Sequence, residues 1–508
     1  MRYLHSFRRW IFCGMLIACI AGFSGVSSAG WQAVGVPGFT PDAVDYTCLA
    51  IDSSNIPTIA FCDWDHDQKA SVMRFTGTGW VNVGLAGFTP GVAHYVSLAI
   101  SSTGTPYVAY RDWADPNNSI SVMRYTGSAW QNVGTSGFSA WFVEDVCLKL
   151  DSNDVPYVAF MDGGNSNRIT VMKFNGSIWE NVGPAGFSAG GVDFVCLNLD
   201  YNDAPFVAYS DDYFDGKATV MQFSGGIWQT IGSGGFTPDE ASYLSMDLFC
   251  NATPYVAFQD RAAGGAVSVM KFNGTGWEFV GSQGFSPDFA YDISLALDSI
   301  DRLYVAYMDK SNPGYEGTVK KWNGSSWETV GGQGISDGMI DYTSLTFDSS
   351  DTPYVGFSDH GHDQKATVLK YISDGTPTPT PVPMDLGVQI ELAANPVHPN
   401  DQFWVKAHLV NTYPPMNQIP VFVILDVYQT LFFWPTWTLY DPPAHPDIAY
   451  SVMDIPTGTT TLNVLPAFTW PDTGPATVTG LYFYGAMLAP DMTAILGDMA
   501  VIDWGYGP

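Results

Sequence analysis

Seven aspartates recur along the chain at intervals of 49 or 50 residues, each at the end of a short apolar segment such as Tyr107–Asp112. They are Asp63, Asp112, Asp162, Asp211, Asp260, Asp309 and Asp359. A ring of carboxylates could hold metal ions, but a residue that is identical in every repeat more often meets a need that every repeat shares. We therefore expect these aspartates to accept backbone N–H bonds where a strand turns.

The residues near these aspartates differ from one repeat to the next, and several of them are aromatic or charged. Aromatic rings can stack on the C–H face of a sugar while neighbouring carboxylates accept its hydroxyl hydrogens. The alternative is ordinary packing of surface loops. The candidate ligand-binding residues are Trp64, Asp65, His66, Arg111, Trp113, Trp141, Phe142, Tyr213, Phe214, Tyr315, His360 and His362.

Two of these loops have spacings that are found in metal sites. Asp63, Asp65 and Asp67 begin like a calcium-binding loop, but the Gly at position six and the Glu at position twelve are missing. His360 and His362 could ligate a metal, but a third ligand is not evident. The sequence predicts no cofactor, and Ca²⁺ is the one ion to consider.

A second set of polar residues occurs three positions before a recurring Ser or Cys. Its members are Asp45, His94, Glu144, Asp193 and Asp341, whereas Ser242 and Tyr291 fill the other two repeats. We expect these side chains to point toward the mouth of a central channel. Because the set varies, it is a better candidate than the seven aspartates for a site that binds a cation or a polar ligand.

The elements that position these residues follow from a repeated phrase, W-x-x-[VI]-G. Its copies begin at Trp31, Trp80, Trp130, Trp179, Trp228, Trp277 and Trp327. Each repeat reads as four short strands, and the last of them carries the Trp. Four antiparallel strands repeated around an axis form the blades of a β-propeller.

The strand count predicts how the ring closes. The first strand occurs seven times, near Cys48, Ser97, Cys147, Cys196, Ser245, Ser294 and Ser344. The Trp strands are offset, because Trp31 precedes the first complete repeat and the seventh repeat ends at Tyr371 without one. We predict that Trp31–Gly35 pairs beside Val368–Tyr371 as the outer strand of blade seven, which removes the exposed sheet edges.

Residues 1–29 contain three arginines, an apolar run and a small-residue segment, which predicts a secretory signal peptide. The protein is therefore expected to be secreted or on the cell surface; the alternative is a lipoprotein with a lipid on Cys19. The formal net charge of −30 argues against nucleic acid and anionic membrane surfaces as partners. Beyond the leader, no hydrophobic segment is long enough to span a bilayer.

The sequence divides after the leader into a propeller (30–373), a Thr/Pro-rich linker (374–383) and an Ig-like β-sandwich (384–508). The sandwich is expected from alternating segments at Leu386–Leu392, Phe403–Val410, Val421–Tyr428, Leu462–Phe468 and Val478–Met487. The run from Asn395 to Asn411 also resembles a signature of bacterial Ig-like surface modules, with Asn400 in place of the usual Gly. The predicted fold is all-β, a seven-bladed propeller followed by a sandwich.

Enzyme signatures are scarce. Gly186–Gly190 matches G-x-S-x-G, but it is one copy of a Gly-Phe-Ser/Thr phrase that recurs in other repeats, and H-E-x-x-H is absent. The region 31–371 resembles secreted bacterial propellers with sialidase-like (BNR-type) repeats, which carry Y-V-A-Y-x-D. The resemblance implies the fold and not the activity, because the S-x-D-x-G-x-T-W box is missing and an arginine triad is not expected from Arg111 and Arg261 alone.

These features predict a secreted, non-enzymatic binding or adhesion protein. Its blade-specific loops would bind a glycan or an extracellular protein, and the sandwich would space or dock the ring. One alternative is a polysaccharide hydrolase or lyase that acts at the channel mouth through Glu144 or Asp193. The other is a structural component of the cell envelope.

Overall fold

A computed structural model of the protein describes residues 30–372, apart from 250, 251 and 300, and a set of strands between residues 386 and 506. The predicted signal peptide, Cys19 and the Thr/Pro linker lie outside these residues. In the described part, helical structure is confined to five single 3₁₀ turns: η1 (Trp64–His66), η2 (Gly163–Asn165), η3 (Asp212–Phe214), η4 (Arg261–Ala263) and η5 (His360–His362). No described helix is long and apolar enough to cross a membrane.

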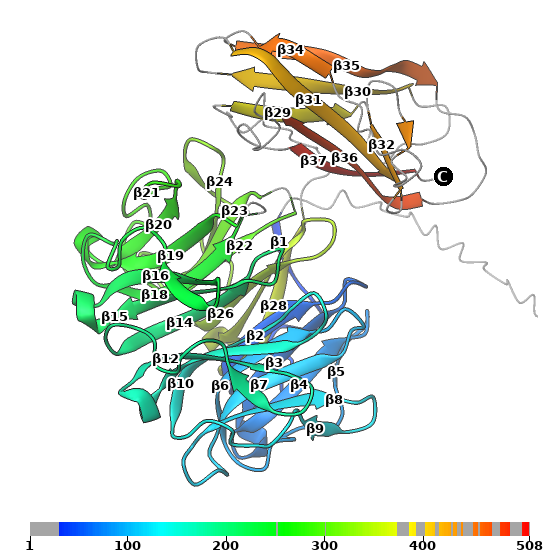
Figure 1. Ribbon diagram of the computed structural model, residues 1–508. Coiled ribbons are helices and arrows are strands. Elements are labelled where there is room, and N and C mark those ends of the chain that lie inside the picture. The colour runs from blue at the N-terminus through cyan, green and yellow to red at the C-terminus, as the bar shows by residue number, and fades with distance from the viewer. Residues whose placement is uncertain are drawn as a thin grey trace, which may run out of the picture.

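Seven four-stranded antiparallel sheets form the blades of a propeller (Figure 1). The innermost strands are β2 (Val44–Ile51), β6 (Ala93–Ile100), β10 (Val143–Leu150), β14 (Val192–Leu199), β18 (Ala241–Leu248), β22 (Ala290–Leu297) and β26 (Ile340–Phe347). The second strands are β3 (Pro57–Asp63), β7 (Pro106–Asp112), β11 (Pro156–Asp162), β15 (Pro205–Asp211), β19 (Pro254–Asp260), β23 (Leu303–Asp309) and β27 (Pro353–Asp359).

The third strands are β4 (Lys69–Phe75), β8 (Ile120–Tyr125), β12 (Arg168–Phe174), β16 (Lys217–Ser224), β20 (Ala266–Phe272), β24 (Gly317–Trp322) and β28 (Lys365–Ile372). The outermost strands are β5 (Trp80–Asn82), β9 (Trp130–Asn132), β13 (Trp179–Asn181), β17 (Ile227–Thr230), β21 (Trp277–Phe279), β25 (Trp327–Thr329) and β1 (Gly30–Ala33). Blades are numbered 1 to 7 from the sheet that contains β2.

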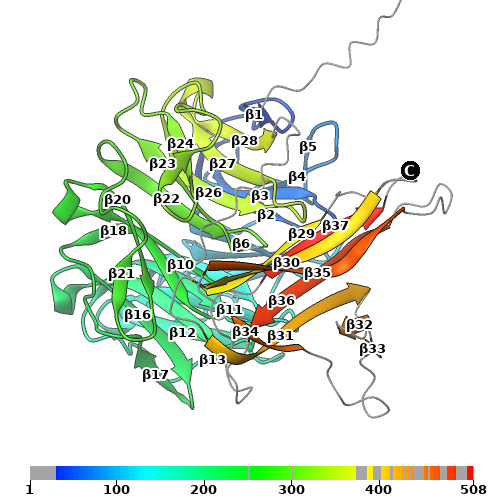
Figure 2. The ribbon, with the colours of Figure 1, turned by 90° about the horizontal axis from the view of Figure 1, so that it is seen from above.

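The N-terminal strand closes the ring. β1 pairs antiparallel with β28, and Trp31 lies opposite Tyr371. The innermost strand of blade 7, β26, contacts that of blade 1, β2, so the circle of inner strands is complete (Figure 2). Both the number of blades and the closing strand are confirmed.

The second strands supply most of the core because both of their faces are covered by neighbouring blades. In one cluster, Ala60 and Val72 of blade 1 pack with Val108 and Tyr110 of blade 2, and all four are almost fully buried. Strands that are buried on both faces are typically continuous apolar runs, and the repeated Y-V-A-Y segment is such a run.

The repeated Trp ties each blade to the one before it. In blade 3, the indole Nε1 of Trp179 donates to the carbonyl of Val133 at 2.7 Å, and the ring stacks on Phe138 with centroids 4.3 Å apart. Gly134 follows Val133 at φ +75°, and a Cβ there would come within 2.9 Å of Phe174. The phrase W-x-x-V-G and the later Gly-Phe are therefore two halves of one contact between blades.

The recurring Ser or Cys of the innermost strand links neighbouring blades near the axis. Ser97 Oγ accepts from the backbone N–H of Leu148 at 3.0 Å, and Cys48 Sγ accepts from Leu98 at 3.3 Å. Burial raises the pKa of the Cys48 thiol. Cys48, Cys62, Cys147 and Cys196 are free thiols, and the three on innermost strands serve as small linking residues.

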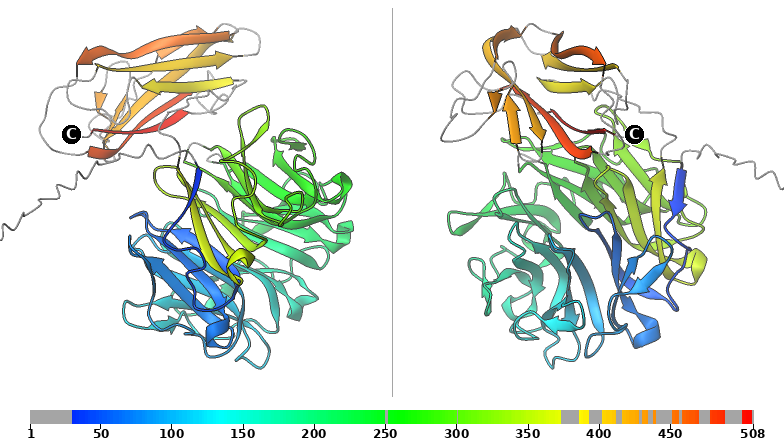
Figure 3. Two further views of the ribbon diagram at one scale, coloured as in Figure 1. Left: turned by 180° about the vertical axis from the view of Figure 1, so that it is seen from behind. Right: turned by 90° about the vertical axis from the view of Figure 1, so that its right-hand side faces the viewer.

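The C-terminal strands form two sheets (Figure 3). The first consists of β29 (Leu386–Leu392), β30 (Gln402–Asn411) and β35 (Gly458–Thr469). The second has β33 (Thr438–Leu439), β32 (Thr430–Phe433), β31 (Met416–Val427), β36 (Val478–Met487) and β37 (Ala500–Tyr506), with β34 (Ser451–Ile455) also paired to β31. The Ig-like assignment stays a prediction, because Asn395–Asn400 lie outside the described residues.

Candidate functional site

The seven aspartates form a buried layer of caps at the ends of the second strands. In blade 1, Asp63 accepts from the Asp65 N–H at 3.1 Å and from Ser71 Oγ at 2.5 Å, and Ser71 Oγ in turn accepts from the Gly87 N–H at 2.8 Å. Each of the other six aspartates likewise accepts from a backbone N–H two residues on and from a Ser or Thr hydroxyl of the third strand. These bonds confirm the capping role that the repeat predicted.

Two of the candidate histidines belong to this cap layer. His66 Nδ1 lies 3.0 Å from Asp63 Oδ2, and His362 Nδ1 lies 2.9 Å from Asp359 Oδ2. Both side chains also pack against glycines of adjacent loops, where an added Cβ would meet their Cβ atoms at 2.6 and 2.7 Å. Both histidines are therefore part of the turn that the cap holds.

The loop proposed as a calcium site is held together by protein donors. Asp63 already binds Ser71 and His66, and Asp67 is the left-handed C-cap of η1. Asp65 Oδ2 lies 3.7 Å from His66 Nδ1. Among the described residues, no group of three His, Cys, Asp or Glu is placed to hold a metal ion.

One residue beyond the cap, the side chain in blades 1 and 2 turns toward the start of the innermost strand. This follows from the register, because Val44 of β2 lies opposite Asp63 of β3. Trp64 Nε1 donates to Asp45 Oδ2 at 2.7 Å. In blade 2 the rings of Trp113 and His94 lie 5.2 Å apart.

Blade 7 repeats this arrangement with a histidine. His360 Nε2 lies 2.5 Å from Asp341 Oδ2. The contact pairs a candidate loop residue with a candidate channel residue of the same blade, as the pairs in blades 1 and 2 do.

Arg111 joins blades 2 and 3. Its Nη1 lies 3.1 Å from Glu144 Oε1, and its guanidinium carbon lies 5.3 Å from the Trp113 ring and 5.7 Å from the Phe142 ring. Its Nε is buried without a hydrogen-bond partner. The guanidinium is thus held between two aromatic rings and one carboxylate.

These contacts form two sets, one in blade 1 and one across blades 2 and 3, and the ring of Tyr46, which follows Asp45, lies 5.4 Å from His94 between them. We call the seven predicted residues in these sets the mouth cluster: Asp45, Trp64, His94, Arg111, Trp113, Phe142 and Glu144. The Tyr46 ring also lies 5.0 Å from Tyr342, which follows Asp341 in blade 7. Trp64 and Trp113 each keep 48% of their surface exposed, so their rings can meet a ligand.

The remaining candidates lie elsewhere on the ring. Phe214 packs against Gly234 and Gly235 of the loop leaving blade 4, and Tyr213 meets it edge-on with centroids 5.0 Å apart. Tyr315 lies in the loop between β23 and β24 of blade 6. Trp141 is exposed beside η2. Burial raises the pKa of Asp193 in blade 4, and the charges of Asp212 and then Glu144 raise it further.

Sequence reasoning missed a ring of residues directly after the channel set. Each innermost strand contains a β-bulge at this point, and the residue there has a positive φ between 48° and 55°. The ring consists of Tyr46, Tyr95, Asp145, Phe194, Tyr243, Asp292 and Tyr342. An alignment of the repeats shifted by one residue would have revealed the five aromatics and two carboxylates, but not the bulge.

Two groups of this region titrate away from their ordinary range. Burial, reinforced by the charges of Asp193 and Glu144, raises the pKa of Asp145 to about 6, although the Phe194 N–H opposes the shift. Burial and the Arg111 charge lower the pKa of His94. His94 is therefore neutral near pH 7 and can both donate and accept a hydrogen bond.

Searches against family models and against curated proteins find no match. Among solved structures, the protein is similar to one of unknown function from Dyadobacter fermentans, at 10% identity over 68% of this chain and 100% of the other, with a TM-score of 0.39. An ulvan lyase of a new polysaccharide lyase family matches at 12% identity over 67% of this chain and 96% of the other, with a TM-score of 0.43.

The six-bladed fucose-recognising lectin of Aleuria aurantia matches at 15% identity over 57% of this chain and 96% of the other, with a TM-score of 0.39. At these identities and TM-scores no ligand or activity transfers to this protein.

Proposed function

We propose that this protein binds glycans through the mouth cluster and acts as a secreted or cell-surface binding protein. The observation that carries the proposal is the pair of half-exposed indoles, Trp64 and Trp113, each fixed by a polar partner of the channel set. A ring that is held in place but open on one face suits stacking on a sugar. The ligand class comes from this geometry and not from the similar structures.

The polar groups around these indoles suit hydroxyl groups. Arg111 supplies donors, Asp45 and Glu144 supply acceptors, and neutral His94 supplies one of each. Because Arg111 is already paired with Glu144, the cluster has no unpaired cation for an acidic sugar. We therefore expect neutral saccharides to bind here more tightly than acidic ones.

The test is glycan binding by the full chain, measured on an array and then by calorimetry with the best ligand. Trp64→Ala and Trp113→Ala should each weaken binding at least about tenfold, if a sugar stacked on an indole contributes as a stacked base does, on the order of 1–3 kcal/mol. Tyr201→Ala is the matched control, because Tyr201 is 74% exposed in a turn on the opposite side of blade 4. Equal affinity in all four proteins, or no binding to any neutral glycan, would refute the proposal.

A second candidate function is a polysaccharide hydrolase or lyase acting at the same mouth. It is favoured by three neighbouring carboxyls, those of Asp145, Asp193 and Glu144. Burial raises the pKa of Asp145 to about 6 and also raises that of Asp193, and the charge of Glu144 adds to both shifts. Carboxyls whose pKa values differ can divide the acid and base roles. Product release from a polysaccharide that disappears in Glu144→Gln or Asp193→Asn, with binding retained, would support this function over simple binding.

A further inference from the structure

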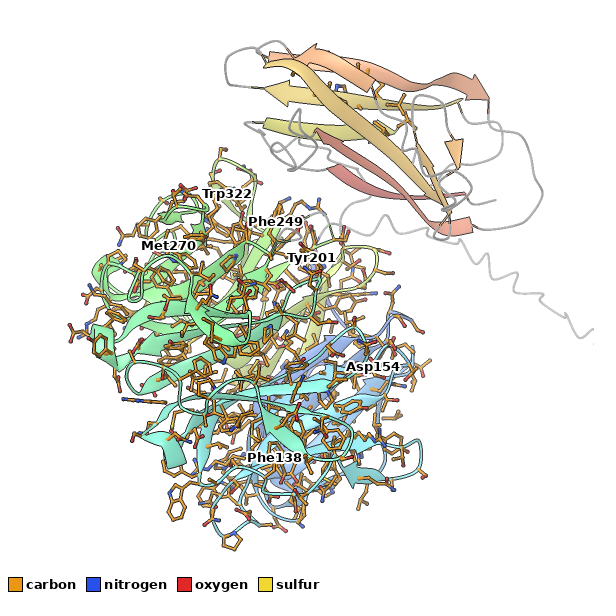
Figure 4. The ribbon with its side chains drawn as sticks, viewed as in Figure 1. Phe138, Asp154, Tyr201, Phe249, Met270 and Trp322 are labelled. Carbon is orange, nitrogen blue, oxygen red and sulfur yellow. The ribbon has the colours of Figure 1, made fainter. Side chains whose placement is uncertain are left out.

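A cavity of about 560 Å³ lies between blades 2 and 3, on the side of the ring away from the mouth cluster. Its wall includes the turn between β10 and β11, where Asp154 lies (Figure 4), and the starts of β7 and β11. The volume falls within the range of small-molecule sites, about 300–1,000 Å³. The side chains that give it chemical character are Tyr107, Arg124, Asp151, Asp154, Tyr157 and Lys173.

Arg124 differs from the residues at its position in the two neighbouring blades, because it lacks the acidic partners that they have. In blade 3, Lys173 lies opposite Glu180, 3.8 Å from its carboxylate; in blade 2, Gln131 lies opposite Arg124. In blade 1, Arg74 donates to the Gly104 carbonyl at 2.9 Å and lies 3.9 Å from Asp52.

Blade 2 has Ser101 at the position that corresponds to Asp52. Both acidic partners are therefore replaced in the same blade. Within the described chain, the Arg124 side chain makes no hydrogen bond or ion pair, and it is exposed. The cavity thus contains a guanidinium that the protein itself leaves unpaired.

The two carboxylates of the cavity wall form no ion pair with Arg124, and each is bound instead by backbone groups. Asp151 Oδ1 accepts from the N–H groups of Asn153 and Val155, both at 2.8 Å. Asp154 accepts from the N–H and the hydroxyl of Ser102, both at 2.7 Å. Their orientation is fixed by these bonds, and their remaining lone pairs are available to hydroxyl donors.

Two phenols complete the wall. Tyr107 and Tyr157 occupy the same position in adjacent blades, and their rings are nearly buried. In the described residues their hydroxyl groups have no protein partner, although the cavity wall includes both side chains. The space therefore offers one strong cationic anchor and several neutral or acidic groups suited to hydroxyls.

We propose that this cavity binds one anionic sugar residue, whose acidic group pairs with the Arg124 guanidinium while its hydroxyls meet Tyr107, Tyr157 and the two aspartates. A guanidinium fork matches a carboxylate or sulfate group. A small inorganic anion would leave most of the volume unfilled and would face Asp151 and Asp154 without hydroxyls to bind them. The site is separate from the mouth cluster and does not depend on its function.

The experiment is a titration of the full chain with glucuronate and with glucose 6-sulfate, followed by calorimetry and by shifts in tyrosine NMR signals. Glucose and inorganic sulfate are the comparison ligands. We expect one of the two acidic sugars to bind at least about tenfold more tightly than either comparison ligand, since a hydrogen bond to a charged group contributes about 1.5–3 kcal/mol. Which of the two binds identifies the acidic group.

Arg124→Gln should abolish that preference for the acidic sugar, and Arg74→Gln, the same repeat position outside the cavity, should retain it. Trp64→Ala should also retain it, which separates this site from the mouth cluster. Arg124→Gln is expected to fold because the Arg124 side chain makes no hydrogen bond or ion pair, and an unchanged melting temperature checks this. The proposal is overturned if glucose or sulfate binds as tightly as the acidic sugars, if neither acidic sugar binds, or if Arg124→Gln binds like the parent protein.

Discussion

Two adjacent positions at the end of each second strand differ in their roles, because one is the same in every blade and the next one varies. The aspartate is buried and is bound by a backbone N–H and a hydroxyl in all seven blades, whereas the next residue is Trp, Trp, Gly, Asp, Arg, Lys or His in blades 1 to 7. The first position maintains the blade, so every blade needs the same residue. The second meets a residue of the channel set in blades 1, 2 and 7, and a difference there costs little stability and can change what binds.

The largest effect on the free energy of unfolding should come from removing the repeated Trp, which is the largest of the side chains that recur in every blade. Trp179→Ala removes a buried indole, its bond to Val133 and its stacking on Phe138, and should destabilise folding by about 3–5 kcal/mol. Trp64→Ala, at an exposed mouth position, should cost less than about 1 kcal/mol. Urea unfolding of both variants measures the difference. Similar losses of stability would contradict the distinction between repeated structural positions and variable exposed ones.

The cap itself should give the next largest effect. Asp260 is fully buried and accepts from the Ala262 N–H, Ser268 Oγ and Gln283 Nε2. Asp260→Ala leaves these donors unsatisfied and should lower the free energy of unfolding by about 2–3 kcal/mol. The measurement is again urea unfolding, with Asp239→Ala, in an exposed loop, as the control. A loss below that of the control would show that the cap is dispensable.

A smaller effect should depend on pH and arise from the bulge ring. Because the folded-state pKa of Asp145 is raised to about 6, the folded protein binds the extra proton, and stability falls as pH rises from about 4 to 6. Asp145→Asn should remove about 1–2 kcal/mol of this fall. Thermal unfolding at pH 4 and pH 7 compares the slopes; a variant with the parent slope would contradict the assignment.

The smallest effect is expected one residue from a cap. Arg261 lies 2.8 Å from Glu240, but the two side chains are 68% and 44% exposed. Arg261→Ala should therefore change the free energy of unfolding by no more than about 0.5 kcal/mol. Comparing Arg261→Ala with Asp260→Ala in the same assay contrasts a variable exposed position with the repeated buried one next to it. A cost near that of Asp260→Ala would show that the exposed pair is structural.

The ring could be predicted closely because the period of the sequence is also the period of the structure. Trp31 without a preceding repeat, and Tyr371 without a following Trp, were enough to predict that β1 pairs with β28. The C-terminal strands were harder. Leu386–Leu392 and Val478–Met487 were predicted with the bounds that β29 and β36 have, but Ser451–Ile455 and Ala500–Tyr506 were missed, because short segments without a repeat are hard to distinguish from loops.

The candidate residues were harder still, since a loop residue such as His66 reads like His360 in the sequence. In the structure His66 binds the cap at Asp63, whereas His360 reaches Asp341. The third residue of the turn is directed at the cap, and the first is directed at the channel. That distinction depends on the 3₁₀ geometry of η1 and η5, which no pattern of residue types displays.

The sequence alone determined the number of blades, the residues that join them and the order of strands within each, because local patterns repeated seven times leave few other ways to bury the Trp and the Y-V-A-Y strands. Only the tertiary structure decided which of the variable side chains meet. Trp64, Arg111 and Glu144 come from three blades, and the unpaired guanidinium of Arg124 lies between two. Such neighbours are set by the curvature of the closed ring and by the bulges of its inner strands, and neither is written in any single repeat.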